Sequence, residues 1–450
     1  MLKKLLNYLE NKKILILGFG KEGYASYKFL RKNFPEKQIF IADKNTNLSN
    51  NVELLEDIYV ELSLGENYLN GIEEYDLILK TPGISFKDID ISKFEDKITS
   101  QLQLFLEYVD MYSIGITGTK GKSTTSTLIY KVLMDQNKDA FLIGNIGEPI
   151  FNQIEEFSQD SIAVIEISSH ALEYIKKSTN IAILLDIFEE HLDHYKNLEK
   201  YIEAKFNLAK YQEKSDLLLY NYDNELMNKF NYNYKENDYA VSMKSIPNNK
   251  NSIFLKDGFI YCNNHKIMNI QEEMNLKGTH NINNIMFVLG VCNILNLDFE
   301  IAIKTIKKFI PLEHRMEFFA KLDGVEYYND SIATIPEATI NAIKALQNVT
   351  TLIVGGKDRG VDLSELITFL SKSEIQNIIC LPKTGEFIKE GLEFSNKNVY
   401  FEENLRDAVK IAKNVTQKGI CLLSPAASSY GYFKNFEERG RLFKEYVISN

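Results

Sequence analysis

The sequence predicts an α/β protein made of three domains in series, and three observations support this fold class. The chain has 450 residues, whereas a single hydrophobic core stops growing at roughly 250 to 300 residues. A pattern of apolar run, turn and helical segment, typical of parallel βαβ units, starts afresh at three places along the chain. Hydrophobic residues make up 44% and charged residues 25% of the chain, as in ordinary globular proteins.

The first domain is expected over residues 1–101 and is predicted to be Rossmann-like. Apolar runs at 13–18, 38–43 and 75–83 predict strands, and the segment 24–34 has helical spacing. This alternation of strand and helix implies a parallel sheet.

The second and third domains are expected over residues 102–311 and 312–450. In the second, short antiparallel strands are expected within 231–270, and the other elements are strands at 112–118, 161–168, 180–188 and 216–223 with helices at 123–136 and 280–295. The third is predicted to be Rossmann-like, with strands at 324–330, 351–356, 377–382 and 419–425. Three domains in series place binding sites in the clefts between them.

Charge and cysteine usage exclude several classes of protein. A formal net charge of −10 disfavours nucleic acids and membrane surfaces as partners, because both are polyanions. The four cysteines form no CxxC pair, which argues against a disulfide framework or a zinc site. We find no signal peptide, and the most apolar run, 181–188, is far below the ~18 residues of a membrane span. We therefore expect a soluble monomer in the cytoplasm.

A glycine-rich loop at 115–125, GITGTKGKSTT, follows one predicted strand and opens a predicted helix. In such a loop the backbone N–H groups and the helix N-terminus cradle phosphates, a lysine pairs with them and a hydroxyl reaches Mg²⁺. Ile116 stands where the standard spacing has glycine, and a turn that binds nothing is the alternative. The loop predicts a P-loop-type ATPase domain, with a phosphate site formed by Gly118, Thr119, Lys120, Gly121, Lys122, Ser123 and Thr124.

A second glycine motif, GFGKEG at 18–23, follows the first predicted strand, and Asp43 ends the next one. Taken alone, GxGxxG with a downstream acid suggests a nicotinamide cofactor, although the same geometry suits any diphosphate on a helix N-terminus. A Rossmann turn without a ligand is the third possibility.

A series of further motifs follows the loop in order. They are GNIG at 144–147, EISSHALE at 166–173, EEHLDHY at 189–195, YIEAK at 201–205, KGTHNINN at 277–284, HRMEFF at 314–319, YYNDSIAT at 327–334, IVGGKDRGVDL at 353–363 and LLSPAASSYGYFKNFEERG at 422–440. With TGTKGKST, a variant shared with folylpolyglutamate synthetases, they resemble the Mur ligase family over all three domains. The last segment is characteristic of the members that add glutamate.

The resemblance implies a set of catalytic and metal-binding residues. Lys122, Glu166, His191 and Lys205 are expected to be catalytic, and Ser123, Glu166, His191 and Lys205 to serve two Mg²⁺ ions. Lys205 is expected to be carbamylated by CO₂, which would turn a cation into an anion beside the metals. From the residues alone, Glu166 could be a structural strand end, His191 a solvated surface residue and Lys205 a salt-bridged or exposed surface lysine.

The resemblance also assigns residues to three substrates. For the UDP substrate they are Lys21, Glu22, Asp43, Thr81, Gly83, Asn145 and His191; for ATP, beyond the loop, Asn281, Asn284, Arg315 and Asp330; and for glutamate Thr334, Arg359, Ser429 and Phe436. Asn281 could instead cap a helix.

The implied reaction adds D-glutamate to UDP-N-acetylmuramoyl-L-alanine through an acyl phosphate, giving ADP and phosphate in the cytoplasmic part of peptidoglycan synthesis. Ile332 stands where many relatives have lysine, which leaves L-glutamate open as the amino acid that is added. One alternative is a folylpolyglutamate-synthetase-like ligase or a different amino-acid-adding Mur enzyme, and the segment 424–440 argues against both. The others are a nicotinamide-dependent oxidoreductase and a non-catalytic nucleotide-binding module. The oxidoreductase leaves the phosphate loop without a role.

Overall fold

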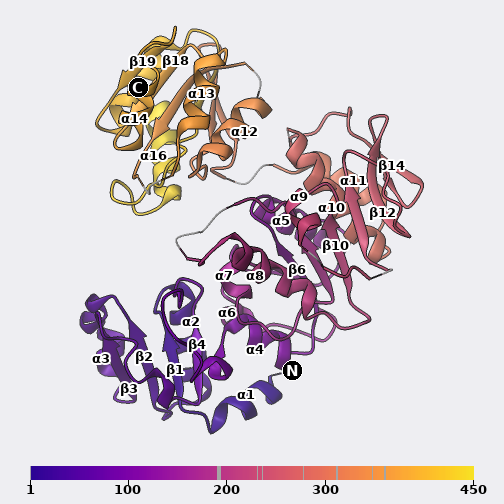
Figure 1. The fold of residues 1–450 in the computed structure, drawn as a ribbon, viewed down its shortest axis with the longest axis vertical. Coiled ribbons are helices and arrows are strands. Elements are labelled where there is room, and N and C mark those ends of the chain that lie inside the picture. The colour runs from indigo at the N-terminus through magenta and orange to yellow at the C-terminus, as the bar shows by residue number, and fades with distance from the viewer. Residues whose placement is uncertain are drawn as a thin grey trace. The chain divides into compact units, whose positions relative to one another are not determined.

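The computed structural model describes residues 2–189, 194–230, 232–235, 237–276, 278–310, 313–346, 348–358 and 361–449. Within them the strands form three sheets, which Figure 1 traces in chain order. Contacts divide the chain into two compact units. One is Met1–Glu273 with His280–Lys307, and the other is Lys308–Asn450 with Met274–Thr279.

The N-terminal sheet is parallel and has the order β3-β2-β1-β4-β5. Its strands are β1 (Ile14–Leu17), β2 (Ile39–Asp43), β3 (Val60–Leu64), β4 (Leu77–Lys80) and β5 (Ile98–Thr99), and its helices are α1 (Lys3–Glu10), α2 (Lys21–Asn33) and α3 (Val52–Glu56). The strands β2 and β3 lie on one side of β1, and the chain then crosses to place β4 and β5 on the other side. The carboxyl ends of β1 and β4 therefore flank a topological switch point, where open α/β sheets bind ligands.

Both faces of this sheet are covered. Ile14 and Ile16 belong to a core shared with the central sheet, while Leu15 and Leu17 belong to a second core on the opposite face. This alternation explains why β1 reads as a continuous apolar run. In addition, α1 packs on α4 (Gln101–Tyr108) and α2 packs on α6 (Ile150–Gln153), which joins the first sheet to the central one.

The central sheet has the order β14-β13-β12-β11-β10-β9-β6-β8-β7. Its strands are β6 (Tyr112–Thr117), β7 (Ala140–Gly144), β8 (Ile162–Glu166), β9 (Ile181–Leu184), β10 (Leu217–Asn221), β11 (Tyr239–Ser242), β12 (Asn251–Lys256), β13 (Phe259–Cys262) and β14 (His265–Asn269). The remaining helices are α5 (Lys122–Asp135), α7 (Ser169–Leu172), α8 (Leu198–Lys210), α9 (Glu225–Lys229), α10 (Thr279–Ile294) and α11 (Phe299–Lys308). The parallel strands β8 and β9 flank β6, so their carboxyl ends meet beside the loop that follows β6.

The C-terminal sheet has the order β15-β16-β20-β17-β18-β19 and is parallel except for β15. Its strands are β15 (Glu317–Leu322), β16 (Val325–Asn329), β17 (Val349–Gly355), β18 (Asn377–Leu381), β19 (Asn398–Phe401) and β20 (Gly419–Leu423). The helices α12 (Pro336–Leu346), α13 (Ser364–Lys372) and α14 (Thr384–Gly391) share a core with one face, and α15 (Leu405–Val415) and α16 (Phe436–Ile448) share a core with the other.

The predicted three-domain α/β architecture is confirmed, whereas the exact boundaries at 101 and 311 stay predictions. The antiparallel strands expected within 231–270 are present as β12, β13 and β14, but β11 runs parallel to both of its neighbours. No helix among the described residues is long and apolar enough to cross a membrane.

Candidate active site

The loop between β6 and α5 is shaped by two glycines with positive φ, Gly118 at 155° and Gly121 at 85°. A Cβ on Gly121 would lie 2.4 Å from Oδ1 of Asn284, and one on Gly118 would lie 2.7 Å from Cβ of Leu185. Glycine is therefore required at both positions by backbone conformation and by space. No side chain caps the start of α5, so its first N–H groups are available to an anion.

The predicted phosphate-binding side chains lie around this loop. Lys122 Nζ donates to the carbonyl oxygens of Gly118 at 2.9 Å and Thr119 at 3.1 Å, which folds the lysine over the loop. Ser123 and Thr124 occupy the first turn of α5, and Lys120 lies between the two glycines. The structure thus brings the predicted loop residues together at one helix N-terminus.

Glu166 ends β8 directly beside the loop strand, as predicted, because Ile116 of β6 pairs with Glu166 in the parallel ladder. Its side chain is buried, and Oε1 accepts a hydrogen bond from Asn145 Nδ2 at 2.7 Å. Oε2 has no hydrogen-bond partner among the described residues. A buried carboxylate oxygen without a partner is costly, and a bound cation would satisfy it.

Lys205, on α8, is only 2% exposed, so the alternative of a surface lysine is wrong. Its Nζ donates to Gly118 O at 2.8 Å and lies 4.7 Å from the ring centroid of Tyr201. The Tyr201 hydroxyl in turn lies 2.7 Å from Thr119 Oγ1. Lys205 therefore packs directly against the phosphate loop. The predicted metal ligand His191 lies outside the described residues.

The predicted UDP-binding residues of the N-terminal sheet gather at its switch point. Thr81 Oγ1 donates to Leu17 O at 3.1 Å, and a Cβ on Gly18 would overlap Thr81 Oγ1 at 2.1 Å. The Asp43 carboxylate accepts backbone N–H groups from Phe19 at 2.6 Å and Asn45 at 2.7 Å. Asp43 thus braces the turn after β1. Gly83 follows β4, and a Cβ on it would meet nothing within 4 Å.

A cavity of about 210 Å³ joins the UDP-binding candidates to Glu166. Lys21 and Glu22 line it from the first turn of α2, Asn145 from the loop after β7, and Glu166 from the end of β8. Lys21 Nζ also donates to Gly147 O at 3.3 Å, which links the start of α2 to the loop after β7. The structure therefore places these four candidates around one space.

A buried ionic cluster beside this cavity was missed in the sequence. Lys80, 4% exposed at the end of β4, has its Nζ 3.5 Å from Glu173 Oε2, which lies 3.1 Å from His194 Nε2. The His194 and His170 rings are 4.0 Å apart. Burial lowers the pKa of Lys80, and Glu173 opposes this shift. Only the polar Lys80 at the end of an apolar run hinted at this cluster, because its members are far apart in the chain.

The adenosine candidates Asn281 and Asn284 lie on the first turns of α10. Asn284 Nδ2 donates to Asn281 Oδ1 at 3.2 Å, and Asn284 contacts Gly121 as described above. The alternative that Asn281 caps this helix is wrong, because α10 begins at Thr279. Asn283 Nδ2 donates to Asp186 at 3.2 Å, and the Asp186 carbonyl accepts the Thr119 N–H, so α10 is tied to the loop.

The remaining candidates belong to the second unit and are described within it. Asp330 follows β16 and accepts hydrogen bonds from Met316 N at 3.1 Å and Ser424 Oγ at 2.8 Å. The nearby Arg315 has a buried Nε without a partner among the described residues. Asp330 therefore fixes the loop that carries Arg315.

The predicted glutamate-binding segments are held together by Arg439, a fully buried side chain on α16. It donates to Ser331 O at 2.7 Å, Ser331 Oγ at 3.0 Å and Ala427 O at 3.1 Å, and Ser331 Oγ donates to Phe436 O at 2.8 Å. The loops carrying Thr334 and Ser429 thus meet the start of α16. Ser429 lines a cavity of about 660 Å³, whose described lining does not include Thr334 or Phe436. Arg359 lies outside the described residues.

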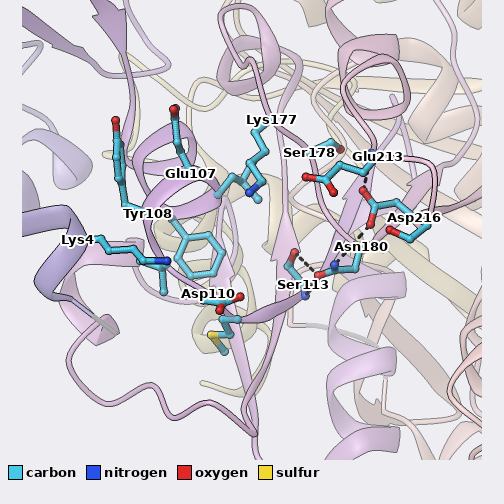
Figure 2. Close-up of a pocket in the computed structure, with 15 residues that line it drawn as sticks. Lys4, Glu107, Tyr108, Asp110, Ser113, Lys177, Ser178, Asn180, Glu213 and Asp216 are labelled. Atoms are coloured by element: carbon cyan, nitrogen blue, oxygen red, sulfur yellow. Dashed lines mark hydrogen bonds between the residues drawn. The ribbon is translucent and has the colours of Figure 1, made fainter. Parts of the chain in front are cut away.

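Two other features of the described chain contain none of the predicted site residues. One is a polar cavity of about 320 Å³, in which Ser113, Asn180 and Asp216 are linked by hydrogen bonds (Figure 2). The other is the group of Glu313, His314 and Glu317, whose ligand atoms lie within 4.8 Å of one another. Lys444 pairs with both glutamates, so its ammonium group already offsets part of their charge.

Comparisons with known proteins agree with this arrangement. Family models match for the MurD-like N-terminal domain at residues 12–100, the Mur ligase middle domain at 116–292 and the glutamate ligase domain of Mur ligases at 314–427. The UDP-N-acetylmuramoylalanine–D-glutamate ligases of Clostridium acetobutylicum and Clostridium novyi are 34% and 32% identical to this chain, over 98% of it and 97% of each relative.

Solved structures share the fold. The UDP-N-acetylmuramate-alanine ligase MurC of Thermotoga maritima matches with a TM-score of 0.60 at 16% identity, covering 97% of this chain and 99% of that one. The MurF ligase of Thermotoga maritima, solved in complex with ADP, matches with a TM-score of 0.60 at 15% identity, covering 96% and 93%. With three matching domains and relatives aligned over nearly its whole length, this chain belongs to the Mur ligase family.

Proposed function

We propose that this chain uses ATP to join D-glutamate to UDP-N-acetylmuramoyl-L-alanine, releasing ADP and phosphate in the cytoplasmic part of peptidoglycan synthesis. The observation that carries the proposal is the meeting of a phosphate loop with Glu166 on the adjoining strand, whose Oε2 has no hydrogen-bond partner in the described part of the chain. The relatives aligned over nearly the whole chain bear the name of this reaction. Four free cysteines suit a reducing compartment.

ATP is proposed to bind with its phosphates on the N-terminus of α5. The uncapped N–H groups and Lys122 supply positive charge, and Asn281 and Asn284 offer amide groups on the neighbouring helix. The donor set at this place fits Mg²⁺, because Glu166 Oε2 lacks a partner among the described residues and Ser123 adds a hydroxyl. A bound Mg²⁺ would neutralise charge on the triphosphate.

Lys205 is proposed to act as a carbamate. Its Nζ already donates to Gly118 O, and a carbamate nitrogen keeps one N–H for that bond. The added carboxylate group would carry negative charge toward the metal site that we propose at the loop. Incubation with ¹³CO₂ should give a carbamate carbon signal by NMR that is lost in Lys205→Arg.

The UDP substrate is proposed to occupy the cavity between α2 and β8. Its diphosphate would lie on the N-terminus of α2, with Thr81 and Gly83 on the neighbouring loop and Asn145 facing them. Because Glu166 lines the same cavity, the substrate carboxylate can approach the γ-phosphate from this side.

The reaction follows from positioning and charge. The substrate carboxylate attacks the γ-phosphate, ADP leaves, and the resulting acyl phosphate is attacked by the amine of glutamate, which expels phosphate and forms the amide. Lys122 stabilises charge that develops on the phosphoryl oxygens. Arg315 is proposed to contact adenosine, and Thr334, Ser429 and Phe436 are proposed to contact glutamate.

A phosphate-release assay tests the proposal. Purified protein with Mg²⁺-ATP and UDP-N-acetylmuramoyl-L-alanine should release phosphate only when D-glutamate is added, and mass spectrometry should show the glutamylated product. Release with L-glutamate alone would reverse the choice of enantiomer. No release with either enantiomer would overturn the ligase assignment, and folate substrates would then be tried in the same assay.

A further inference from the structure

The cavity proposed to take the diphosphate contains a carboxyl group where an anion is expected to bind. Glu22 lies in the first turn of α2, a helix of 13 residues, and lines the cavity of about 210 Å³ together with Lys21, Asn145 and Glu166. Glu166 is 2% exposed and its Oε2 lacks a hydrogen-bond partner among the described residues, so this cavity is built for a ligand. If Glu22 and Glu166 were both ionised, they would repel a diphosphate strongly, because little water enters the cavity to screen the charges.

The surroundings of Glu22 raise the pKa of its carboxyl group. The residue as a whole is partly buried, but protein surrounds its carboxyl group closely enough that desolvation raises its pKa to about 7, against the attraction of Lys80. No described side chain donates a hydrogen bond to this carboxyl group. Gln101 Nε2 instead donates to the Glu22 carbonyl at 2.8 Å, which fixes the backbone of the helix start.

The charged groups around Glu22 come from several elements. Lys21 precedes it on α2, Lys80 approaches from β4 and Glu166 faces the cavity from β8. The charge of Lys80 is shared with Glu173, whose Oε2 lies 3.5 Å from it, and Glu173 is also paired with His194. The field of Lys80 at Glu22 is therefore partly cancelled.

We propose that Glu22 binds the diphosphate of the UDP substrate as a neutral carboxylic acid, donating its O–H to a phosphoryl oxygen beside the N–H groups of α2. This inference rests on the proposed function. A protonated carboxyl is a donor, and an O–H bond to an anionic oxygen is short and strong. The ionised form has no donor and would compete with the ligand for the helix N-terminus.

The proposal makes substrate binding depend on pH with a fixed sign. The diphosphate diester stays ionised across neutral pH, so the substrate itself adds no titration there. As pH rises above the pKa of Glu22, the binding-competent form falls about tenfold per pH unit in the limit, and the dissociation constant rises by the same factor.

The test is calorimetric titration of the full-length protein with UDP-N-acetylmuramoyl-L-alanine between pH 6.5 and 9. For the natural chain, the dissociation constant should rise about tenfold per pH unit at the alkaline end. Glu22→Gln keeps the shape and a donor but cannot ionise, so its affinity should change by less than about twofold over the range. Lys80→Met removes the group that lowers the pKa of Glu22 and should move the midpoint to higher pH.

Proton uptake gives an independent readout. Repeating the titration at pH 8 in buffers of different ionisation enthalpy should show uptake of nearly one proton per substrate for the natural chain and none for Glu22→Gln. Mg²⁺-ATP binding serves as the control and should show neither effect. A flat pH profile in the natural chain, or the same decline in Glu22→Gln, overturns the inference. Absence of UDP-substrate binding at every pH would instead overturn the proposed function.

Discussion

At the scale of single residues, the candidate site is marked by a carboxylate whose hydrogen bonding is incomplete. Glu166 has one oxygen bonded to Asn145 and one oxygen without a partner among the described residues. Leaving one buried acceptor without a partner costs roughly 1 to 3 kcal/mol, and more when the group is charged. A sequence that served stability alone would place a neutral or apolar side chain here, so the position is best explained by binding.

Replacing Glu166 should therefore separate activity from stability. In Glu166→Gln, phosphate release should fall by at least about 100-fold, because the proposed metal ligand loses its charge, while the melting temperature should stay equal or rise. Glu155→Gln, at a partly exposed carboxylate that pairs with Lys32, is the matched control and should keep its activity within about twofold. An active Glu166→Gln enzyme would remove this residue from the site.

The raised pKa of Glu22 also predicts how stability depends on pH. Its carboxyl group has a pKa of about 7 in the folded chain against 4.5 as the reference, so the folded state holds a proton that the unfolded state releases between these values. Stability is therefore lost as pH rises through this window. Glu22→Gln should melt at the same temperature as the natural chain at pH 4.5 and higher than it at pH 8. An equal difference at both pH values would contradict the shift.

At the scale of elements, the phosphate loop depends on glycine conformations that no other residue supplies cheaply. Gly121→Ala would force a Cβ to within 2.4 Å of Asn284 Oδ1 at a φ of 85°. We expect a loss of about 1 to 3 kcal/mol in the free energy of unfolding and a large loss of ATP affinity. Gly20→Ala, where a Cβ would meet nothing within 4 Å, is the stability control. Thermal unfolding with and without Mg²⁺-ATP measures both effects.

The elements also show what sequence patterns can and cannot predict. The central strands β1, β6, β8, β17 and β20 were predicted, because strands buried on both faces read as apolar runs. The strands β3, β5, β7, β15 and β19 were missed, and each of them lies at an edge of its sheet. An edge strand such as β3, VELSL, is partly exposed and carries no such run.

The same distinction holds for the candidate site. The phosphate loop and Glu166 could be predicted, because a local motif marks the first and a strand end beside it marks the second. The cluster of Lys80, Glu173 and His194 could not, because its members come from three distant segments and meet only in the folded chain. The partial burial of Glu22, which decides its protonation, is likewise a property of tertiary structure.

At the scale of the whole molecule, the two compact units differ in what holds them together. In the first, one hydrophobic core runs from the N-terminal sheet into the central one, with Leu5, Ile16, Phe105 and Leu184 in the same cluster. In the second, the cores on the two faces of the sheet contain only residues beyond position 315. Cutting within the first unit would therefore expose a large apolar surface, whereas the second unit buries its own.

This difference predicts that residues 313–450 fold without the rest of the chain. Alternate residues of the inner strands serve opposite faces, as Ile378 and Ile379 do on β18, and helices cover both faces. A domain of this size with two closed cores should unfold cooperatively with roughly 5 to 15 kcal/mol of stability, measured by circular dichroism in urea. The fragment should bind no Mg²⁺-ATP by calorimetry, because the phosphate loop lies in the other unit. A fragment that remains unfolded while the full chain folds would show that the second unit depends on the first.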